Sequence, residues 1–116
     1  MLGMNETLEF HKLEGLGNDF ILVDNRDGGY DRFIGQAEKL CYRHFGIGAD
    51  GLILLEESGS DDFKMRIINA DGTEPQMCGN GVRCFAKYVD DLGLVDGDTF
   101  TIETLAGRIV PTLVRE

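Results

Sequence analysis

One cysteine in this 116-residue chain stands where its thiol would be both exposed and activated. Cys78 is followed by Gly79-Asn80-Gly81, and a helix is predicted to begin directly after it. The first N–H groups of a helix have no partner inside it, and the helix dipole adds partial positive charge there. A thiolate is stabilised at such a point, and N–H groups left uncovered by glycine can hold a small carboxylate. The arrangement predicts acid–base chemistry at the carbon next to a carboxylate.

The helix that would carry this cysteine is indicated by the spacing of its apolar residues. One predicted face holds Val82, Phe85, Ala86, Val89 and Leu92. Gly93 then stands where a C-terminal cap is expected. If the glycines around Cys78 only lend flexibility, that cysteine is a buried structural residue instead, because free cysteine is often buried. The residues alone leave both interpretations open.

The other two cysteines are expected to pack in the interior. Cys41 falls on the apolar face of a short helix that Asp31 could cap. Cys84 lies about 9 Å further along the helix axis than Cys78, toward the core. Neither is placed to act on a substrate from the side opposite Cys78. Three cysteines at irregular spacing predict reduced thiols, and the lack of a C-x-x-C pair argues against a metal site.

The charge balance restricts the possible partners. The chain carries 21 acidic and 11 basic side chains and a formal net charge of -10. It has no basic run, so neither nucleic acid nor an anionic membrane surface is expected as a partner. No stretch approaches the roughly 20 apolar residues of a membrane span. Residues 1–6 lack the basic start and the apolar run of a signal peptide, so a cytoplasmic location is expected.

Alternating or continuous apolar runs predict six strands, at residues 8–12, 20–24, 52–57, 63–69, 99–104 and 108–114. A glycine-rich turn is predicted at 14–19 and a hairpin turn at Ala106-Gly107. Pro111 indicates an edge position for the last strand. We expect a single domain over residues 1–116. The chain stops directly after a strand, which we interpret as a fragment boundary.

A glycine pattern at residues 46–51 matches the G-x-G-x-x-G of dinucleotide sites. The segment reads Gly-Ile-Gly-Ala-Asp-Gly. A dinucleotide site needs a strand before this pattern and a helix after it. Here a predicted helix comes before and a predicted strand comes after, so no nucleotide cofactor is expected.

Four blocks of the chain carry a family resemblance. They are Glu14-Gly15-Leu16-Gly17-Asn18-Asp19-Phe20, the 46–51 pattern, Asn69-Ala70-Asp71-Gly72, and Cys78-Gly79-Asn80-Gly81-Val82-Arg83-Cys84. Their order and spacing resemble the N-terminal half of diaminopimelate epimerase, from about Leu8 to Val114. The resemblance implies an α+β fold in which a mixed, mostly antiparallel sheet wraps around a central helix. This would be one half of a two-domain, pseudo-symmetric enzyme.

The resemblance also implies an activity and a set of site residues. Members interconvert LL- and meso-diaminopimelate in lysine biosynthesis, without pyridoxal phosphate, metal or another cofactor. By similarity, Cys78 is the acid/base thiol of this half, and Gly79 and Asn80 hold the α-carboxylate of the substrate. Asn18 and Asn69 match side chains that hydrogen-bond the substrate. The family's second cysteine belongs to a C-terminal half, which is absent here and is the expected partner.

Other interpretations remain beside this one. Gly51 stands where some members carry a substrate-contacting glutamine, so that contact is either lost or made by the backbone. One thiol cannot serve both faces of a carbon, so the chain alone is expected to be inactive. It could be a catalytically silent module that folds and dimerises through exposed strand edges. A related proline or hydroxyproline racemase is a further alternative, but proline has no distal amino-acid group for Asn18 and Asn69 to bind.

Overall fold

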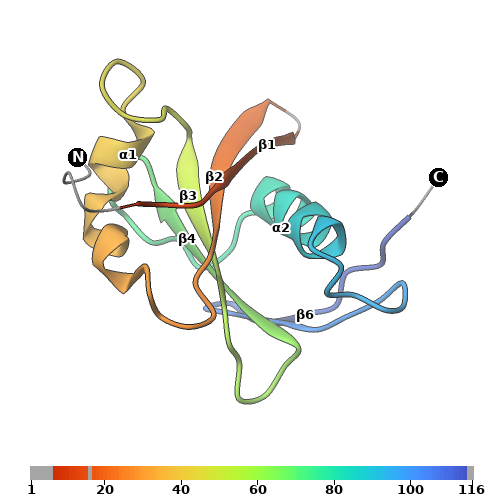
Figure 1. The fold of residues 1–116 in the computed structure, drawn as a ribbon. Coiled ribbons are helices and arrows are strands. Elements are labelled where there is room, and N and C mark those ends of the chain that lie inside the picture. The colour runs from red at the N-terminus through yellow and green to blue at the C-terminus, as the bar shows by residue number, and fades with distance from the viewer. Residues whose placement is uncertain (1–6, 16, 115–116) are drawn as a thin grey trace.

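Six strands form one curved sheet in the computed structural model, which describes residues 7–15 and 17–114 (Figure 1). The strands are β1 (His11–Gly15), β2 (Asn18–Asp24), β3 (Gly51–Glu56), β4 (Phe63–Asn69), β5 (Ile102–Thr104) and β6 (Gly107–Ile109). They lie in the sheet in chain order, and their pairings alternate, starting and ending antiparallel. The predicted α+β fold with a mixed, mostly antiparallel sheet is confirmed.

Helical segments cover both faces of this sheet. On one side lies α2 (Gly79–Asp91); on the other lie the 3-10 helix η1 (Asp31–Gln36) and α1 (Ala37–Cys41). Leu22 packs in the cluster that contains Phe85 of α2, whereas its neighbour Ile21 packs with Phe33 of η1. The continuous apolar run of β2 is therefore buried on both faces. Figure 1 shows the sheet curling round α2, which is the predicted central helix.

The first hairpin differs from its prediction. β1 begins at His11 instead of residue 8 and continues to Gly15, which pairs with Asn18. The predicted six-residue turn therefore shrinks to a two-residue connection, in which Gly17 has a φ of +90°. A positive φ at this position is typical of tight hairpin turns. Leu16, part of the predicted turn, and the chain ends at 1–6 and 115–116 lie outside the described residues.

The segment before β3 forms a helix at the predicted place but does not begin as expected. Its first six residues are a 3-10 helix, and Asp31 does not cap it. Asp31 Oδ1 instead accepts a hydrogen bond from Asn25 Nδ2 at 2.7 Å. Asn25 is the buried polar residue of the β2–η1 connection, and its side chain also receives the backbone N–H of Tyr30 at 2.8 Å. Asp31 is the first residue of the helix and Tyr30 is its N-cap, and Asp31 shares with Glu56 the task of satisfying the buried Asn25 amide.

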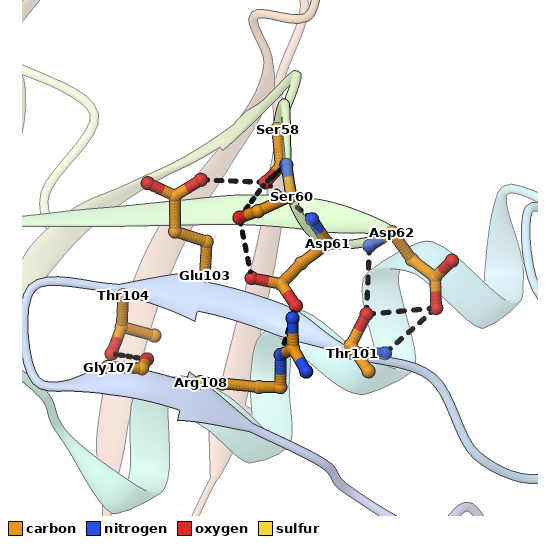
Figure 2. Close-up of polar contacts among 9 residues, drawn as sticks. All are labelled: Ser58, Ser60, Asp61, Asp62, Thr101, Glu103, Thr104, Gly107 and Arg108. Carbon is orange, nitrogen blue, oxygen red and sulfur yellow. Dashed lines mark hydrogen bonds and ion pairs between the residues drawn. The ribbon is translucent and has the colours of Figure 1, made fainter.

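Side-chain contacts add to a short backbone ladder between the C-terminal hairpin and the sheet. β5 pairs with β4 at only two residues, and β6 ends at Ile109, short of the predicted strand that ran to residue 114. Figure 2 shows the polar contacts around this hairpin. Arg108 forms an ion pair with Asp61, and Ser58 Oγ donates to Glu103 Oε1 at 2.6 Å. The hairpin turn itself lies at residues 105–106, one position earlier than predicted.

We expect Arg108→Ala to lower the free energy of unfolding by about 1–2 kcal/mol. The Asp61 side chain is only 5% exposed, so loss of Arg108 would leave a buried carboxylate without its cation. The cost is discounted because the Arg108 side chain is itself 58% exposed. Urea unfolding of both proteins measures the difference. Arg83→Ala, on the exposed side of α2, is the matched control and should stay within about 0.5 kcal/mol. Equal effects of the two substitutions would contradict this role for the ion pair.

None of the helices in the described parts of the chain is long and apolar enough to cross a bilayer.

Candidate active site

Cys78 occupies the N-cap position of α2, where the helical spacing places it. Its backbone is extended, with φ -141° and ψ 119°, and its carbonyl accepts the first helical hydrogen bond from Val82 N at 2.9 Å. The side chain is half-buried and contacts the cluster under α2. Among the described residues, no side chain caps this helix. The thiol therefore lies beside backbone N–H groups that are available to a ligand.

Two glycines shape this helix start in different ways. A Cβ on Gly81 would lie 3.2 Å from Ile67 Cδ1 and 3.4 Å from Ile53 Cδ1. The missing side chain thus lets the first turn of α2 lie directly on the sheet. A Cβ on Gly79 would meet nothing within 4 Å, and Gly79 is exposed. The N–H groups on that side of the turn remain open to solvent.

Asn18 and Asn80 are joined directly, although they are far apart in the sequence. Asn80 Nδ2 donates to Asn18 Oδ1 at 2.6 Å, which links the first turn of α2 to the start of β2. Both side chains are half-buried. Gly15, the β1 residue paired with Asn18, lets α2 approach this end of the hairpin, since a Cβ there would lie 3.2 Å from Cys84 Sγ. The structure thus brings together four of the five residues predicted for the site, namely Asn18, Cys78, Gly79 and Asn80.

Asn69 lies at the same edge of the sheet but is engaged in its own turn. The register across β2, β3 and β4 aligns Phe20 with Gly51 and Gly51 with Asn69. Asn69 Nδ2 donates to Thr73 Oγ1 at 3.2 Å, and Asn69 N donates to Thr73 O at 2.7 Å. Thr73 Oγ1 in turn donates to Asp71 Oδ1 at 2.6 Å. The Asn69 amide is therefore held by its turn and not by the Asn18–Asn80 pair.

Gly51 is buried at this edge and lies against its neighbours. A Cβ there would be 3.2 Å from Ile68 O and 3.3 Å from Phe20 Cδ1. Gly51 thus offers only backbone atoms to a ligand. The preceding residues do not form a dinucleotide loop, because α1 comes before the pattern and β3 comes after it. The expected mismatch of context is confirmed.

The other two thiols are in the interior, as predicted. Cys41 is 3% exposed and Cys84 is 4% exposed. Burial raises the pKa of the Cys41 thiol to about 11. Burial also raises the pKa of the Cys84 thiol, and charge on Cys78 adds to that effect. The burial of these two thiols leaves the half-exposed Cys78 as the accessible thiol.

We expect iodoacetamide to modify one thiol of the native protein and all three in denaturant. Cys78 is half-exposed, whereas Cys41 and Cys84 are closed off by their burial and by their raised pKa. Mass spectrometry of digested samples, taken over time, gives the rate for each cysteine. Modification of Cys84 as fast as Cys78 under native conditions would contradict the packing of α2 described above.

A charged cluster beside Asn18 was not anticipated from the sequence. Asp50 Oδ2 accepts hydrogen bonds from Asn18 Nδ2 at 3.3 Å and from Asp19 N at 3.0 Å. Arg43 donates to both oxygens of Asp19 and holds the pKa of that carboxyl well below its usual range; Lys12 adds to this, while burial opposes it. In the sequence, Asp19 and Asp50 stand in two of the blocks that carry the family resemblance, but nothing there indicates that they lie side by side.

Comparison with known proteins adds to this geometry. A family model described as diaminopimelate epimerase matches residues 10–116. Diaminopimelate epimerase of Caldanaerobacter subterraneus subsp. tengcongensis is 56% identical over 110 residues, which cover 94% of this chain and 39% of that protein. The enzyme of the same name from a Synechocystis strain is 55% identical over 111 residues, covering 94% and 40%. The chain thus spans about two fifths of the length of these curated relatives.

Solved structures of lower sequence identity show the same fold. A phenazine biosynthesis protein of the PhzF family from Enterococcus faecalis has a TM-score of 0.73 at 12% identity, covering 92% of this chain and 40% of that one. A probable proline racemase from Agrobacterium radiobacter K84 has a TM-score of 0.66 at 17% identity, covering 95% and 38%. At such identities the likeness concerns the fold alone.

Proposed function

Because this chain belongs to the diaminopimelate epimerase family, we propose that it carries one of the two proton-transferring thiols of an enzyme that interconverts LL- and meso-diaminopimelate. The observation that carries the proposal is the position of Cys78. Its half-exposed thiol lies at the N-cap of α2, next to the Asn18–Asn80 pair. The proposal places this chemistry in the cytosol, where thiols stay reduced.

The reaction inverts one tetrahedral carbon by moving protons. One thiolate removes the α-proton from one face of the substrate and becomes a thiol. A second thiol delivers its own proton to the opposite face and becomes a thiolate, so neither an oxidant nor a co-reactant is needed. Negative charge grows on the α-carboxylate in between. The N–H groups of Gly79 and Asn80 at the start of α2 would stabilise that charge.

The second thiol has to come from outside these 116 residues. Cys41 and Cys84 are buried, and burial raises the pKa of both. Cys84 also lies on the same helix as Cys78, behind it and toward the core. The proposal therefore assigns the second thiol to a further polypeptide segment, which closes over the substrate from the other side. The greater length of the curated relatives supports this assignment.

Substrate contacts are proposed for the remaining predicted residues. The side-chain nitrogen of Asn18 carries two N–H groups. One donates to Asp50 Oδ2, and the other would bind the substrate. Asn69 would bind the same substrate from the end of β4, held in place by its bond to Thr73. At Gly51 only the backbone can take part. Diaminopimelate carries an amino-acid group at each end, so it can engage several such amides at once.

The test follows exchange of the α-proton. The chain is incubated with LL-diaminopimelate in deuterated water, alone and after addition of the C-terminal segment of a relative such as the Caldanaerobacter enzyme. We expect no loss of the α-proton NMR signal with the chain alone and loss after the segment is added. A well-folded, assembled protein that still gives no exchange would contradict the proposal and favour a catalytically silent module. L-proline, as the alternative substrate, should show no exchange in either sample.

A further inference from the structure

A continuous line of polar contacts runs from a surface ion pair to the start of α2. Arg43 Nη2 donates to Asp19 Oδ1 at 2.8 Å and to Asp50 Oδ1 at 3.3 Å. Asp50 Oδ2 accepts from Asn18 Nδ2 at 3.3 Å, and Asn18 Oδ1 accepts from Asn80 Nδ2 at 2.6 Å. Asp50 itself lies outside the residues assigned to the substrate. Its side chain reaches the start of α2 through Asn18.

The chemistry of these groups permits one order of donors and acceptors. An ionised carboxylate only accepts hydrogen bonds, so the Asn18 side chain must turn its NH2 group toward Asp50. The oxygen of Asn18 then faces Asn80, which must donate. An asparagine amide is nearly symmetric in shape, and without such a constraint it can turn over at little cost. One carboxylate therefore dictates the direction of two amides in sequence.

Asp50 is well held for this purpose. Asp19 N donates to Asp50 Oδ2 at 3.0 Å, and Asp50 N donates back to Asp19 O at 2.9 Å and to Asp19 Oδ1 at 3.2 Å. This reciprocal pair ties the start of β3 to the start of β2. Two neighbouring carboxylates would repel each other, but Arg43 bridges both and Lys12 Nζ lies 3.3 Å from Asp19 Oδ2. These contacts hold the Asp50 carboxylate in the position where it accepts the hydrogen bond from Asn18.

We propose that Asp50 is a positioning residue that fixes, through Asn18, the direction of the Asn80 amide at the start of α2. Asn18 then offers its second N–H to the ligand as a donor, and Asn80 offers its side-chain carbonyl oxygen as an acceptor. A donor suits the carboxylate of an amino acid and an acceptor suits its ammonium group. That the ligand is an amino acid rests on the proposed function. The order of the hydrogen bonds does not depend on it.

NMR of the 116-residue chain tests the order of bonds directly. In the unmodified protein we expect a through-hydrogen-bond coupling between Asn80 Nδ2 and the Asn18 side-chain carbonyl carbon. Absence of that coupling, or the reverse coupling from Asn18 Nδ2 to Asn80, would overturn the proposal. This measurement needs no substitution, so it does not depend on whether a variant folds.

Substitutions test whether Asp50 is the cause. Asp50→Asn keeps the shape but can also donate, so the side-chain NH2 signals of Asn18 and Asn80 should shift or broaden. The double variant Asn18→Asp/Asp50→Asn exchanges the carboxylate and the amide between the two positions. Residue 18 then again accepts a hydrogen bond from Asn80, so the Asn80 signal should return to its original position. Glu57→Gln removes one exposed charge elsewhere and should leave both signals unchanged. An Asn80 signal that ignores Asp50→Asn would overturn the proposal.

Kinetics of the completed enzyme connect the orientation to binding. Asp50→Asn should raise KM about tenfold, the effect of losing one charge-assisted bond, and should lower kcat less. Arg43→Gln leaves the Asp50 carboxylate in place and should change KM less than Asp50→Asn. If the unmodified enzyme shows no exchange, the proposed function fails while the NMR result still decides on Asp50. Exchange with an unchanged KM in Asp50→Asn would contradict the positioning role alone.

Discussion

Cys78→Ser is expected to reduce α-proton exchange at least about 10³-fold in the protein completed by a second thiol. A serine hydroxyl is a much weaker acid than a thiol and is not ionised near neutral pH, so it cannot remove the α-proton. Serine is also a preferred N-cap residue, so the start of α2 should be kept or even stabilised. The variant thus separates the chemistry of residue 78 from the stability of the helix.

Two measurements on the same samples make this prediction decisive. Exchange is followed by loss of the α-proton signal in deuterated water, and stability by thermal unfolding. Cys84→Ala is the matched control, because it removes a buried thiol of the same helix and should keep exchange in the folded fraction. Exchange by Cys78→Ser at the rate of the unmodified protein would remove the assignment of Cys78 as acid or base.

The second large effect is expected from Phe85→Ala, which should cost about 3–5 kcal/mol in the free energy of unfolding. Phe85 is fully buried between α2 and the sheet, and its ring lies edge-on to Phe63 at a centroid distance of 6.3 Å. Its removal leaves a cavity under the helix that carries Cys78. A domain of this size has little stability to spare, so the variant should be largely unfolded or strongly destabilised.

Phe45→Ala is the control for this substitution. Phe45 is 88% exposed in the loop after α1, so truncating it should change stability by no more than about 0.5 kcal/mol. Urea unfolding followed by circular dichroism measures both variants. Similar midpoints for Phe85→Ala and Phe45→Ala would contradict the packing of α2 against the sheet.

Local patterns predicted the elements whose cause is local. The alternation of β4 gave its bounds correctly, and the helical spacing placed α2 with Gly93 just beyond its end, where φ is +74°. β1 was misplaced because its limits depend on pairing with β2, which brings Glu14 and Gly15 into the ladder. The short C-terminal strands were overextended for a similar reason, since side chains around Asp61 hold that hairpin.

In the candidate site, too, local spacing predicted some residues and not others. Cys78 at a helix start followed from spacing, whereas Asn18 and Asn69 came only from the family resemblance, and their roles stay predictions. The sequence does not predict a role for Asp50, because its contacts with Asn18 and Asp19 join residues 32 and 31 positions apart. Asp50 itself stands in the glycine pattern at residues 46–51, which matches a dinucleotide motif only in its spacing and not in its context. Such distant contacts leave no periodic trace in a single sequence.

The order of pairings across the sheet explains why α1 and α2 lie on opposite faces. The parallel pairs β2–β3 and β4–β5 each require a crossover, and each crossover contains a helical segment. Crossovers between parallel strands are almost always right-handed. The antiparallel β3–β4 pair reverses strand direction between them while the chain keeps advancing across the sheet the same way. Because both crossovers have the same hand, the second one, which contains α2, lies on the opposite face from the first. This places α2, with Cys78 at its start, on the concave side of the sheet.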